Sequence, residues 1–212
     1  MTGTLLAWTV SERDKAADQV SNTDRTAPGV TAPDDTVLVR RALTGDGRAY
    51  GDLVRRHQGA ALRVAAGICG STEEARDIVQ DAFVKGHRAL RSWRGDAPVR
   101  SWLLRIVAND ARNAVRARAR RRQREERFGA LREVGGGDPV GDAVALDDEA
   151  RALLDLLGRL DERDRAVLAC RFVAGLSEQE TAVALAVPVG TVKSRTARAL
   201  ERARTLAAEV AS

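Results

Sequence analysis

The sequence predicts an all-α fold: two small helical domains joined by a flexible acidic linker, the second domain a helix-turn-helix. Aromatic residues make up only 3% of the 212 residues and charged residues 31%, a profile typical of packed amphipathic helices rather than of a β-sandwich. Apolar residues recur at helical spacing along most of the chain. The length allows one ordinary domain or two small ones, and the breaks in the apolar pattern favour two.

Two stretches divide the chain because neither carries a sustained apolar period. Residues 1–34 mix Thr, Ser, Pro and Gly with scattered charges, and we interpret them as a disordered N-terminal tail. Residues 131–149 form the linker: three glycines in a row and a proline stop any helix, and from position 133 onward there are six acidic residues and no Lys or Arg. The remaining blocks, 35–130 and 150–212, are small enough to be marginally stable alone.

The first predicted helix begins near Asp46 and carries one apolar stripe that faces a core. His57 lies within this stripe. A metal or acid–base role would require other ligands or a nucleophile nearby, and the sequence arranges none, so we interpret His57 as a hydrogen-bonded core histidine. The stripe consists of Tyr50, Leu53, Val54, His57, Ala61, Val64, Ala65 and Ile68.

The second predicted helix opens with a capping box, in which Ser71 and Glu74 each satisfy an orphan backbone donor. Opposite its apolar face lies a narrow strip that contains two short acids, an amide and a valine. A solvated helix face would account for the acids, whereas the exposed valine and the amide suit docking onto a partner helix, and periodicity alone leaves both interpretations open. This docking strip consists of Asp77, Gln80, Asp81 and Val84.

A third predicted helix follows Pro98 and becomes strongly basic. Between residues 85 and 127 there are 14 basic side chains against four acidic ones, which gives a local net charge of +10 in a chain whose total is only +5. Arginines at this density repel one another unless an anion screens them, and the guanidinium fork matches phosphate. Asn109 and Asn113 lie among them one turn apart, and asparagine is a residue that reads base edges. The segment therefore predicts a nucleic-acid contact.

In the second block, Asp161 is a predicted N-cap, and the sequence that follows is typical of a helix-turn-helix. A second capping box at Ser177 and Glu180 starts a short helix, residues 186–188 form the turn, and a longer helix begins at Val189. The N-terminal half of that longer helix turns a basic edge outward, as a recognition helix does in the major groove. The outward residues are Lys193, Ser194, Ala197 and Arg198, with Arg195 beside them.

Three segments together resemble the sigma-70 family of bacterial RNA polymerase promoter-specificity subunits, in its extracytoplasmic-function (ECF) subgroup. EEARDIVQDAFVKGHRAL resembles the family's core-polymerase-binding helix, and WRGDAPVRSWLLRIVANDARNAVRARARR its promoter-melting and upstream-base-reading helix. GLSEQETAVALAVPVGTVKSRTARALERAR resembles its promoter-reading helix-turn-helix. The resemblance covers about 37–122 and 150–207, and two independent motifs in the right order are more specific than either alone.

The resemblance implies a cytoplasmic transcription initiation factor that serves a specific regulon, as in a stress response. It implies binding to core RNA polymerase through the β′ coiled coil and the β flap, to promoter DNA and to an anti-sigma factor, and it favours docking for the strip on the second helix. The positions that the resemblance assigns to core polymerase are Asp77, Gln80, Asp81 and Val84. Those assigned to the minus-ten element are Asn109, Arg112, Asn113, Arg116 and Arg120, and Asn109 aligns with the residue that reads a flipped base. Those assigned to the minus-thirty-five element are Lys193, Ser194, Arg195, Ala197 and Arg198.

Three residues of the second block depart from the family's pattern. Ala186 stands where a turn glycine is usual, and Thr181 and Thr196 stand where Leu or Ile is usual. We therefore expect the helices of this domain to pack less tightly than in other members.

Two other functions compete with this interpretation. A LuxR-like helix-turn-helix regulator that recruits complete polymerase would explain residues 176–204 but not the basic segment or the docking strip. A nuclease or other enzyme would need clustered carboxylates or histidines, and the acids cluster only in the glycine-rich linker, where no rigid site can form. We therefore expect no catalytic residues, no cofactor and no metal.

The remaining sequence signals concern the cellular compartment of the protein. Cys69 and Cys170 lie about a hundred positions apart without CxxC spacing, which favours neither a disulfide framework nor a zinc site. No apolar run approaches the roughly 18 to 20 residues of a membrane span. The expectation is a cytoplasmic protein without a membrane span.

Overall fold

The computed structural model describes residues 34–127 and 148–210, and every regular element within them is a helix. The all-α prediction is confirmed. The predicted tail, apart from Asp34, and most of the predicted linker lie outside the described residues. Helix α6 begins at Asp148, so the last two positions assigned to the linker, 148 and 149, belong to the second block instead.

The first block is built around one central helix. Helix α3 (Gly47–Cys69) contacts α2 (Asp35–Leu43), α4 (Thr72–Ala89) and α5 (Val99–Arg127), and a short 3-10 turn, η1 (Leu90–Ser92), follows α4. Asp46 caps α3, since its Oδ1 accepts from the backbone N–H groups of Arg48 and Ala49 at 3.0 and 3.2 Å. The predicted stripe on α3 is buried except for Val54, which is half-buried.

Helix α2 was not predicted from the sequence, and its first residue, Asp35, supplies the hydrogen-bond partner of His57. Asp35 Oδ2 lies 2.8 Å from His57 Nε2, and Asp35 Oδ1 accepts from Arg56 Nη1 at 2.5 Å. His57 is only 5% exposed. The interpretation of His57 as a hydrogen-bonded core histidine is therefore confirmed, and Asp35 is its partner.

These contacts make the attachment of α2 pH-dependent. Burial alone would raise the pKa of Asp35, but hydrogen bonds and charge from His57 and Arg56 outweigh it and hold the pKa below its usual 3.8. The resulting stabilisation is complete above about pH 5, where the unfolded chain is also ionised, and it is lost as the pH falls through 3.8 and then through the lowered pKa. We expect Asp35→Asn to lower the free energy of unfolding at pH 7 by about 1 to 3 kcal/mol and to flatten the acid limb of its pH profile. Urea unfolding from pH 2 to 7 measures both.

Asp52→Asn is the matched control, because within the described residues Asp52 pairs with Arg55 of the same helix at an exposed position. If Asp52→Asn and Asp35→Asn had the same effect, the buried contact with His57 would contribute nothing to this pH dependence.

The capping box predicted at Ser71 is only half formed. Ser71 Oγ accepts from the Glu74 N–H at 3.2 Å, as predicted. The carboxylate of Glu74 does not return to Ser71, however: it forms an ion pair with Arg118 Nη1 at 3.0 Å. A guanidinium on the neighbouring helix is a stronger partner than a backbone amide, and this long-range partner could not be seen in the local motif.

The second block contains α6 (Asp148–Gly158), α7 (Glu162–Leu168), a π-helical turn η2 (Ala169–Val173), α8 (Glu178–Leu185) and α9 (Val189–Val210). Both predicted caps are confirmed. Asp161 Oδ1 accepts from the N–H groups of Arg163 and Asp164 at 2.9 Å, and Ser177 and Glu180 form the complete reciprocal box. Helices α8 and α9, with the intervening turn, form the predicted helix-turn-helix.

Ala186 in that turn adopts a backbone conformation suited to glycine. Its φ and ψ are 55° and 47°, the left-handed region. The Cβ of an L-residue is strained there by about 1 to 2 kcal/mol. Glycine has no Cβ and avoids this strain, but it loses more conformational entropy on folding, so only part of the strain energy is recovered as stability. We expect Ala186→Gly to raise the free energy of unfolding by about 0.5 to 1 kcal/mol, measured by thermal and denaturant unfolding. Ala184→Gly, at a buried helical position of α8, should lower it instead.

The two threonines that depart from the family pattern leave polar atoms buried. Thr181 is fully buried, and the Oγ1 atoms of Thr181 and Thr196 have no hydrogen-bond partner in the described part of the chain. A buried hydroxyl without a partner costs about 1 to 3 kcal/mol. The two hydroxyls therefore lower the stability of the second block, and the looser helix packing expected there stays a prediction.

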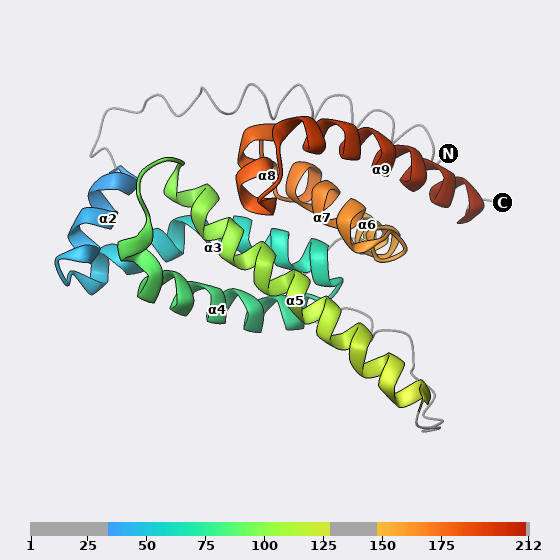
Figure 1. Cartoon of the computed structure of the whole chain (residues 1–212), viewed down its shortest axis with the longest axis horizontal. Coiled ribbons are helices and arrows are strands. Elements are labelled where there is room, and N and C mark those ends of the chain that lie inside the picture. Colours follow the sequence, from blue (N-terminus) through green and yellow to red (C-terminus); the bar gives the residue numbers. More distant parts are fainter. Residues whose placement is uncertain (1–33, 128–147, 211–212) are drawn as a thin grey trace.

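The two blocks pack against each other, which the sequence did not predict. Helices α3 and α5 contact α6, α7, η2 and α8, whereas α4 lies on the other side of α3 and α5 from the second block (Figure 1).

Candidate nucleic-acid and partner-binding surfaces

The docking strip lies on the outer side of α4, as predicted. Asp77, Gln80, Asp81 and Val84 are all exposed, and Val84 is 46% exposed, the highest value among the large hydrophobic residues that are exposed. The opposite face of α4 is buried through Ile78, Val79 and Ala82 among others. Because a large aliphatic side chain gains nothing from contact with water, Val84 favours a docking surface over a merely solvated face.

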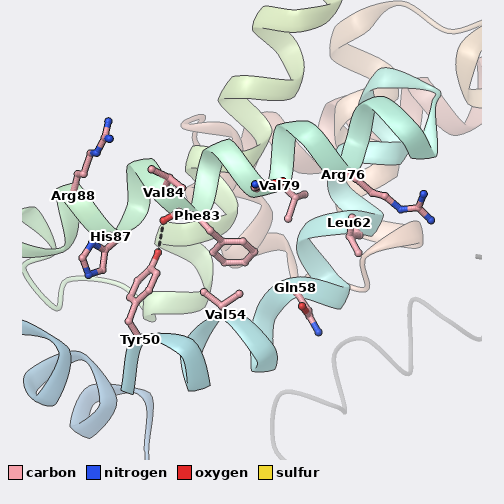
Figure 2. A pocket seen from close by; sticks show the side chains of 11 residues that line it. Tyr50, Val54, Gln58, Leu62, Arg76, Val79, Phe83, Val84, His87 and Arg88 are labelled. Carbon is pink, nitrogen blue, oxygen red and sulfur yellow. Dashed lines mark hydrogen bonds between the residues drawn. The ribbon is translucent and has the colours of Figure 1, made fainter. Parts of the chain in front are cut away.

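Beside the docking strip, an open groove runs between α3 and α4, which the sequence did not predict. It encloses about 800 Å³. Figure 2 shows Val54 and Phe83 facing one another across it, with Arg76 and Arg88 toward its two ends. Tyr50 closes part of it by donating a hydrogen bond to the Phe83 carbonyl at 2.5 Å. The lining residues are Tyr50, Val54, Gln58, Leu62, Arg76, Val79, Gln80, Phe83, Val84, His87 and Arg88.

The strip and the groove form one continuous surface, because Gln80 and Val84 belong to both. The sequence carried one signal of this: Val54, Gln58 and Leu62 follow each other at steps of four along one flank of α3, beside the predicted core stripe. Such a flank is half-buried by a neighbouring helix and remains available to a second one.

The predicted minus-ten residues form a stripe along α5. Asn109, Asn113, Arg116 and Arg120 are exposed, and each follows the last by three or four positions, so they share one side of the helix. Arg112 is half-buried, and its Nη2 donates a hydrogen bond to Asn109 Oδ1. This contact fixes the orientation of the Asn109 amide. The structure thus brings four of the five predicted residues to an exposed side and places the fifth where it positions Asn109.

Two of these arginines also contact the second block. Arg116 forms an ion pair with Glu162 on α7 at 2.8 Å, and Arg112 Nη1 donates to the Leu185 carbonyl, the last residue of α8, at 3.5 Å. Burial, followed by the charge of Arg116, lowers the pKa of Arg112, whereas the hydrogen bond to Glu162 raises the pKa of Arg116. An arginine remains charged after shifts of this kind, so both guanidinium groups are cations at neutral pH.

The recognition helix exposes the predicted edge. Lys193, Ser194, Ala197 and Arg198 are exposed on α9, and Arg195 is half-buried beside them, while Val192 and Ala199 face the core. Lys193 Nζ lies 3.4 Å from Glu178 Oε2 of α8. An ion pair near the surface contributes little stability, so a DNA phosphate can take the place of the Glu178 carboxylate. The helix-turn-helix geometry places this edge at the N-terminal half of α9, where such helices meet base edges.

The described residues give little sign of reactive or metal chemistry. Burial raises the pKa of the Cys69 thiol to about 11 and that of Cys170 to about 12, so neither thiol is a ready nucleophile. In the ranges 34–127 and 148–210, no three His, Cys, Asp or Glu side chains come together in a way that could hold a metal ion. No helix in these ranges is both long enough and apolar enough to cross a membrane.

Known proteins are similar to this chain over both blocks. Residues 53–121 match the family model of sigma-70 region 2, and residues 150–202 match that of sigma-70 region 4. The RNA polymerase sigma-H factor of Pseudomonas aeruginosa is 35% identical over 81% of this chain and 93% of its own. The ECF RNA polymerase sigma-E factor of Escherichia coli K12 is 35% identical over 79% of this chain and 91% of its own.

Two solved structures are similar as well. CnrH, in complex with the cytosolic domain of CnrY, superimposes with a TM-score of 0.63 at 30% identity and covers 82% of this chain and 97% of its own. The sigma factor RpoE of Bartonella quintana, in complex with NepR, gives a TM-score of 0.59 over 74% of this chain and 95% of its own. At 22% identity, the second likeness supports the fold alone.

Proposed function

The chain belongs to the sigma-70 family of RNA polymerase sigma factors, in its extracytoplasmic-function subgroup, and on that premise we propose how its surfaces carry out promoter-specific initiation. As a member of this subgroup it binds core RNA polymerase and directs transcription initiation at a specific set of promoters. A regulator with only a helix-turn-helix does not account for the region 2 match over residues 53–121. The observation that carries the proposal is the presence, in one chain, of an exposed docking strip, a basic helix and a recognition helix in the family's order.

Core polymerase docks on α4 in this proposal. The exposed acids and amide of the docking strip contact the β′ coiled coil, and Val84 buries its side chain at the centre of that contact. The adjoining groove supplies further apolar area from Val54 and Phe83. A central apolar residue with a polar rim is the usual composition of a stable protein interface. The second block docks on the β flap.

The basic helix α5 reads and opens the minus-ten element. Opening a promoter unstacks base steps worth about 1.4 kcal/mol each, and a protein offsets part of that by capturing an extruded base. Asn109, oriented by Arg112, reads that base, and Asn113, Arg116 and Arg120 hold the neighbouring strand. Helix α9 reads the minus-thirty-five element in the major groove through Lys193, Ser194, Arg195 and Arg198, with Ala197 offering at most a contact to a thymine methyl.

The protein acts by binding and has no catalytic reaction of its own; bond formation belongs to core polymerase. It works in the cytoplasm, and an anti-sigma protein that covers the docking strip and groove would keep it from core polymerase. Such a partner would need a helix face that is mainly apolar to fill the groove, because Val54, Leu62, Val79, Phe83 and Val84 line it between two terminal arginines, together with Gln58, Gln80 and His87.

In vitro transcription tests this function. The purified chain, added to core polymerase on a library of genomic fragments, is expected to give transcripts from a limited set of start sites, and core polymerase alone is expected to give none of them. A tight, sequence-specific gel shift by the isolated chain, without any polymerase-dependent start site, would instead identify a duplex-binding regulator.

A further inference from the structure

The groove between α3 and α4 presents apolar side chains that the described residues leave partly uncovered. Val54 and Leu62 of α3 are half-buried, and Val84 of α4 is 46% exposed. Figure 2 shows Val54 and Phe83 facing one another across the groove. Its volume of about 800 Å³ lies within the usual range of ligand pockets, so the groove has room for several side chains of one peptide segment.

Each end of the groove carries an arginine. Arg76 and Arg88 lie toward opposite ends (Figure 2), and neither side chain forms a hydrogen bond or an ion pair with another described residue. Arg88 is exposed and Arg76 is half-buried. A guanidinium group binds a carboxylate more strongly than it binds a neutral acceptor. The groove therefore fits an apolar segment that has no basic residue of its own and is followed by acidic ones.

Residues 1–33, which precede the described part of the chain, contain one segment of this composition. Five of the six residues from Leu5 to Val10 are apolar, and no Lys, Arg, Asp or Glu comes before Glu12. Residues 11–18 then carry three acids against two bases. Trp8 lies within the apolar segment, and tryptophan is among the residues that contribute most to binding at protein interfaces. Elsewhere in residues 1–33 no more than two apolar residues are adjacent.

The chain is long enough to bring this segment to the groove. Residues 11–33 separate Val10 from Asp34, and these 23 residues can span up to about 75 Å. The described chain starts beside α3, because Asp35 lies 2.8 Å from His57 of that helix. The whole of α3, with 23 residues, is only about 35 Å long. Every part of the groove is therefore within reach.

A second apolar stretch outside the described residues, 143–146, is not placed to reach the groove. It ends two positions before Asp148, where α6 begins on the side of α3 away from α4. Two residues span only about 7 Å, which is less than the diameter of one helix, about 10 Å. The N-terminal segment is thus the better candidate to occupy the groove.

We propose that residues 5–10 bind in the groove of their own chain, with Trp8 between Val54 and Phe83, and compete there with core polymerase. The competition arises because Gln80 and Val84 belong both to the groove and to the docking strip. A segment tethered near its site acts at an effective concentration on the order of millimolar, so a weak intrinsic affinity is sufficient. The competition rests on the proposed function, whereas the binding of the segment is a property of the isolated protein.

A fluorescent probe that is quenched by contact with indole detects the bound segment. Bimane is attached to a cysteine that replaces Gln58, an exposed residue of the groove wall, or to one that replaces the exposed Asp155 on α6. The native cysteines are buried and react slowly. Each labelled chain is compared with its Trp8→Phe variant, which keeps an aromatic side chain but removes the indole. Tyr50, which also lines the groove, is the same in both.

We expect Trp8→Phe to raise the emission of the probe at position 58 and to leave that of the probe at position 155 unchanged. The difference should not depend on protein concentration, because the segment and the groove belong to one chain. Unchanged emission at position 58 would overturn the proposal. A difference that disappears on dilution would assign the groove to Trp8 of a second copy and would overturn it as well.

The competition is tested on the whole chain without a probe. Trp8→Glu places a charge against apolar groove walls and should raise the apparent affinity for core polymerase about three- to tenfold, since apparent affinity scales with the fraction of chains whose groove is free. Val30→Glu is the matched control, because it adds the same charge to the same stretch but outside the apolar segment. Trp8→Phe should remain close to the unchanged chain, because phenylalanine also fills the groove.

Binding to a limiting amount of core polymerase, in competition with the unchanged chain, measures these affinities. If Trp8→Glu and Val30→Glu bound equally well, the segment would not compete with core polymerase and the proposal would be wrong. Failure of the proposed function looks different: neither the unchanged chain nor any variant would bind core polymerase, while the bimane emission would still respond to Trp8→Phe.

Discussion

Asp81→Arg is expected to abolish binding to core RNA polymerase while leaving the fold intact. Asp81 is exposed on α4, across the helix from the buried Val79 and Gly86, so the new side chain meets solvent in the free protein. In the complex, reversing a charge within an interface costs several kcal/mol, a loss of at least about a hundredfold in affinity. Gln80→Ala, which removes hydrogen bonds without adding repulsion, should weaken binding by less.

Competition against the unchanged chain for a limiting amount of core polymerase measures this effect. Asp155→Arg is the matched control, because Asp155 is an exposed helical aspartate in the second block and its reversal changes the net charge equally. Circular dichroism and the unfolding midpoint should be the same for both variants. If Asp81→Arg competed as well as Asp155→Arg, the core-binding surface would have to lie elsewhere on the molecule.

Asn109→Ala is expected to remove discrimination at one minus-ten position and to leave the other positions unchanged. A good base contact contributes about 1 to 3 kcal/mol of discrimination, so the preferred base should lose roughly five- to 150-fold of its advantage. Arg116→Ala and Arg120→Ala should instead weaken open-complex formation on every promoter and flatten its salt dependence, because phosphate contacts position without specifying sequence.

Open-complex formation on promoters with each single substitution in the minus-ten element, at two salt concentrations, separates the two behaviours. Comparing the two arginine variants separates the loss of a phosphate contact from the loss of an ion pair within the protein. Arg116 also pairs with Glu162, whereas Arg120 is exposed near the C-terminal end of α5. A uniform loss across all base substitutions in Asn109→Ala would place Asn109 among the phosphate-positioning residues.

The sequence predicted what depends on local pattern. Asp46, Asp161 and the Ser177–Glu180 box are short-range devices, and all of them cap the expected helices. The exposed stripes on α4, α5 and α9 follow from helical period alone, so their geometry was predictable as well.

What the sequence could not predict depends on contacts between distant residues. Helix α2 was missed because it is short and its key residue, Asp35, finds its partner 22 positions away at His57. The carboxylate of Glu74 accepts a hydrogen bond from Arg118, 44 positions away, instead of completing the capping box. The packing of the two blocks depends on Gly67 meeting Ala169, which no pattern within either segment indicates.

The strained Ala186 and the buried hydroxyls of Thr181 and Thr196 lie within one short motif, and together they bear on how long the protein lasts in a cell. Each kilocalorie of lost local stability multiplies the opened population of that motif by about five. Proteases cleave transiently opened segments, and their rate follows that population when reclosing is fast. The helix-turn-helix is therefore expected to set the rate of proteolytic turnover, so that the amount of the factor can fall quickly once its synthesis stops, and a docked β flap or promoter would lengthen its lifetime by mass action.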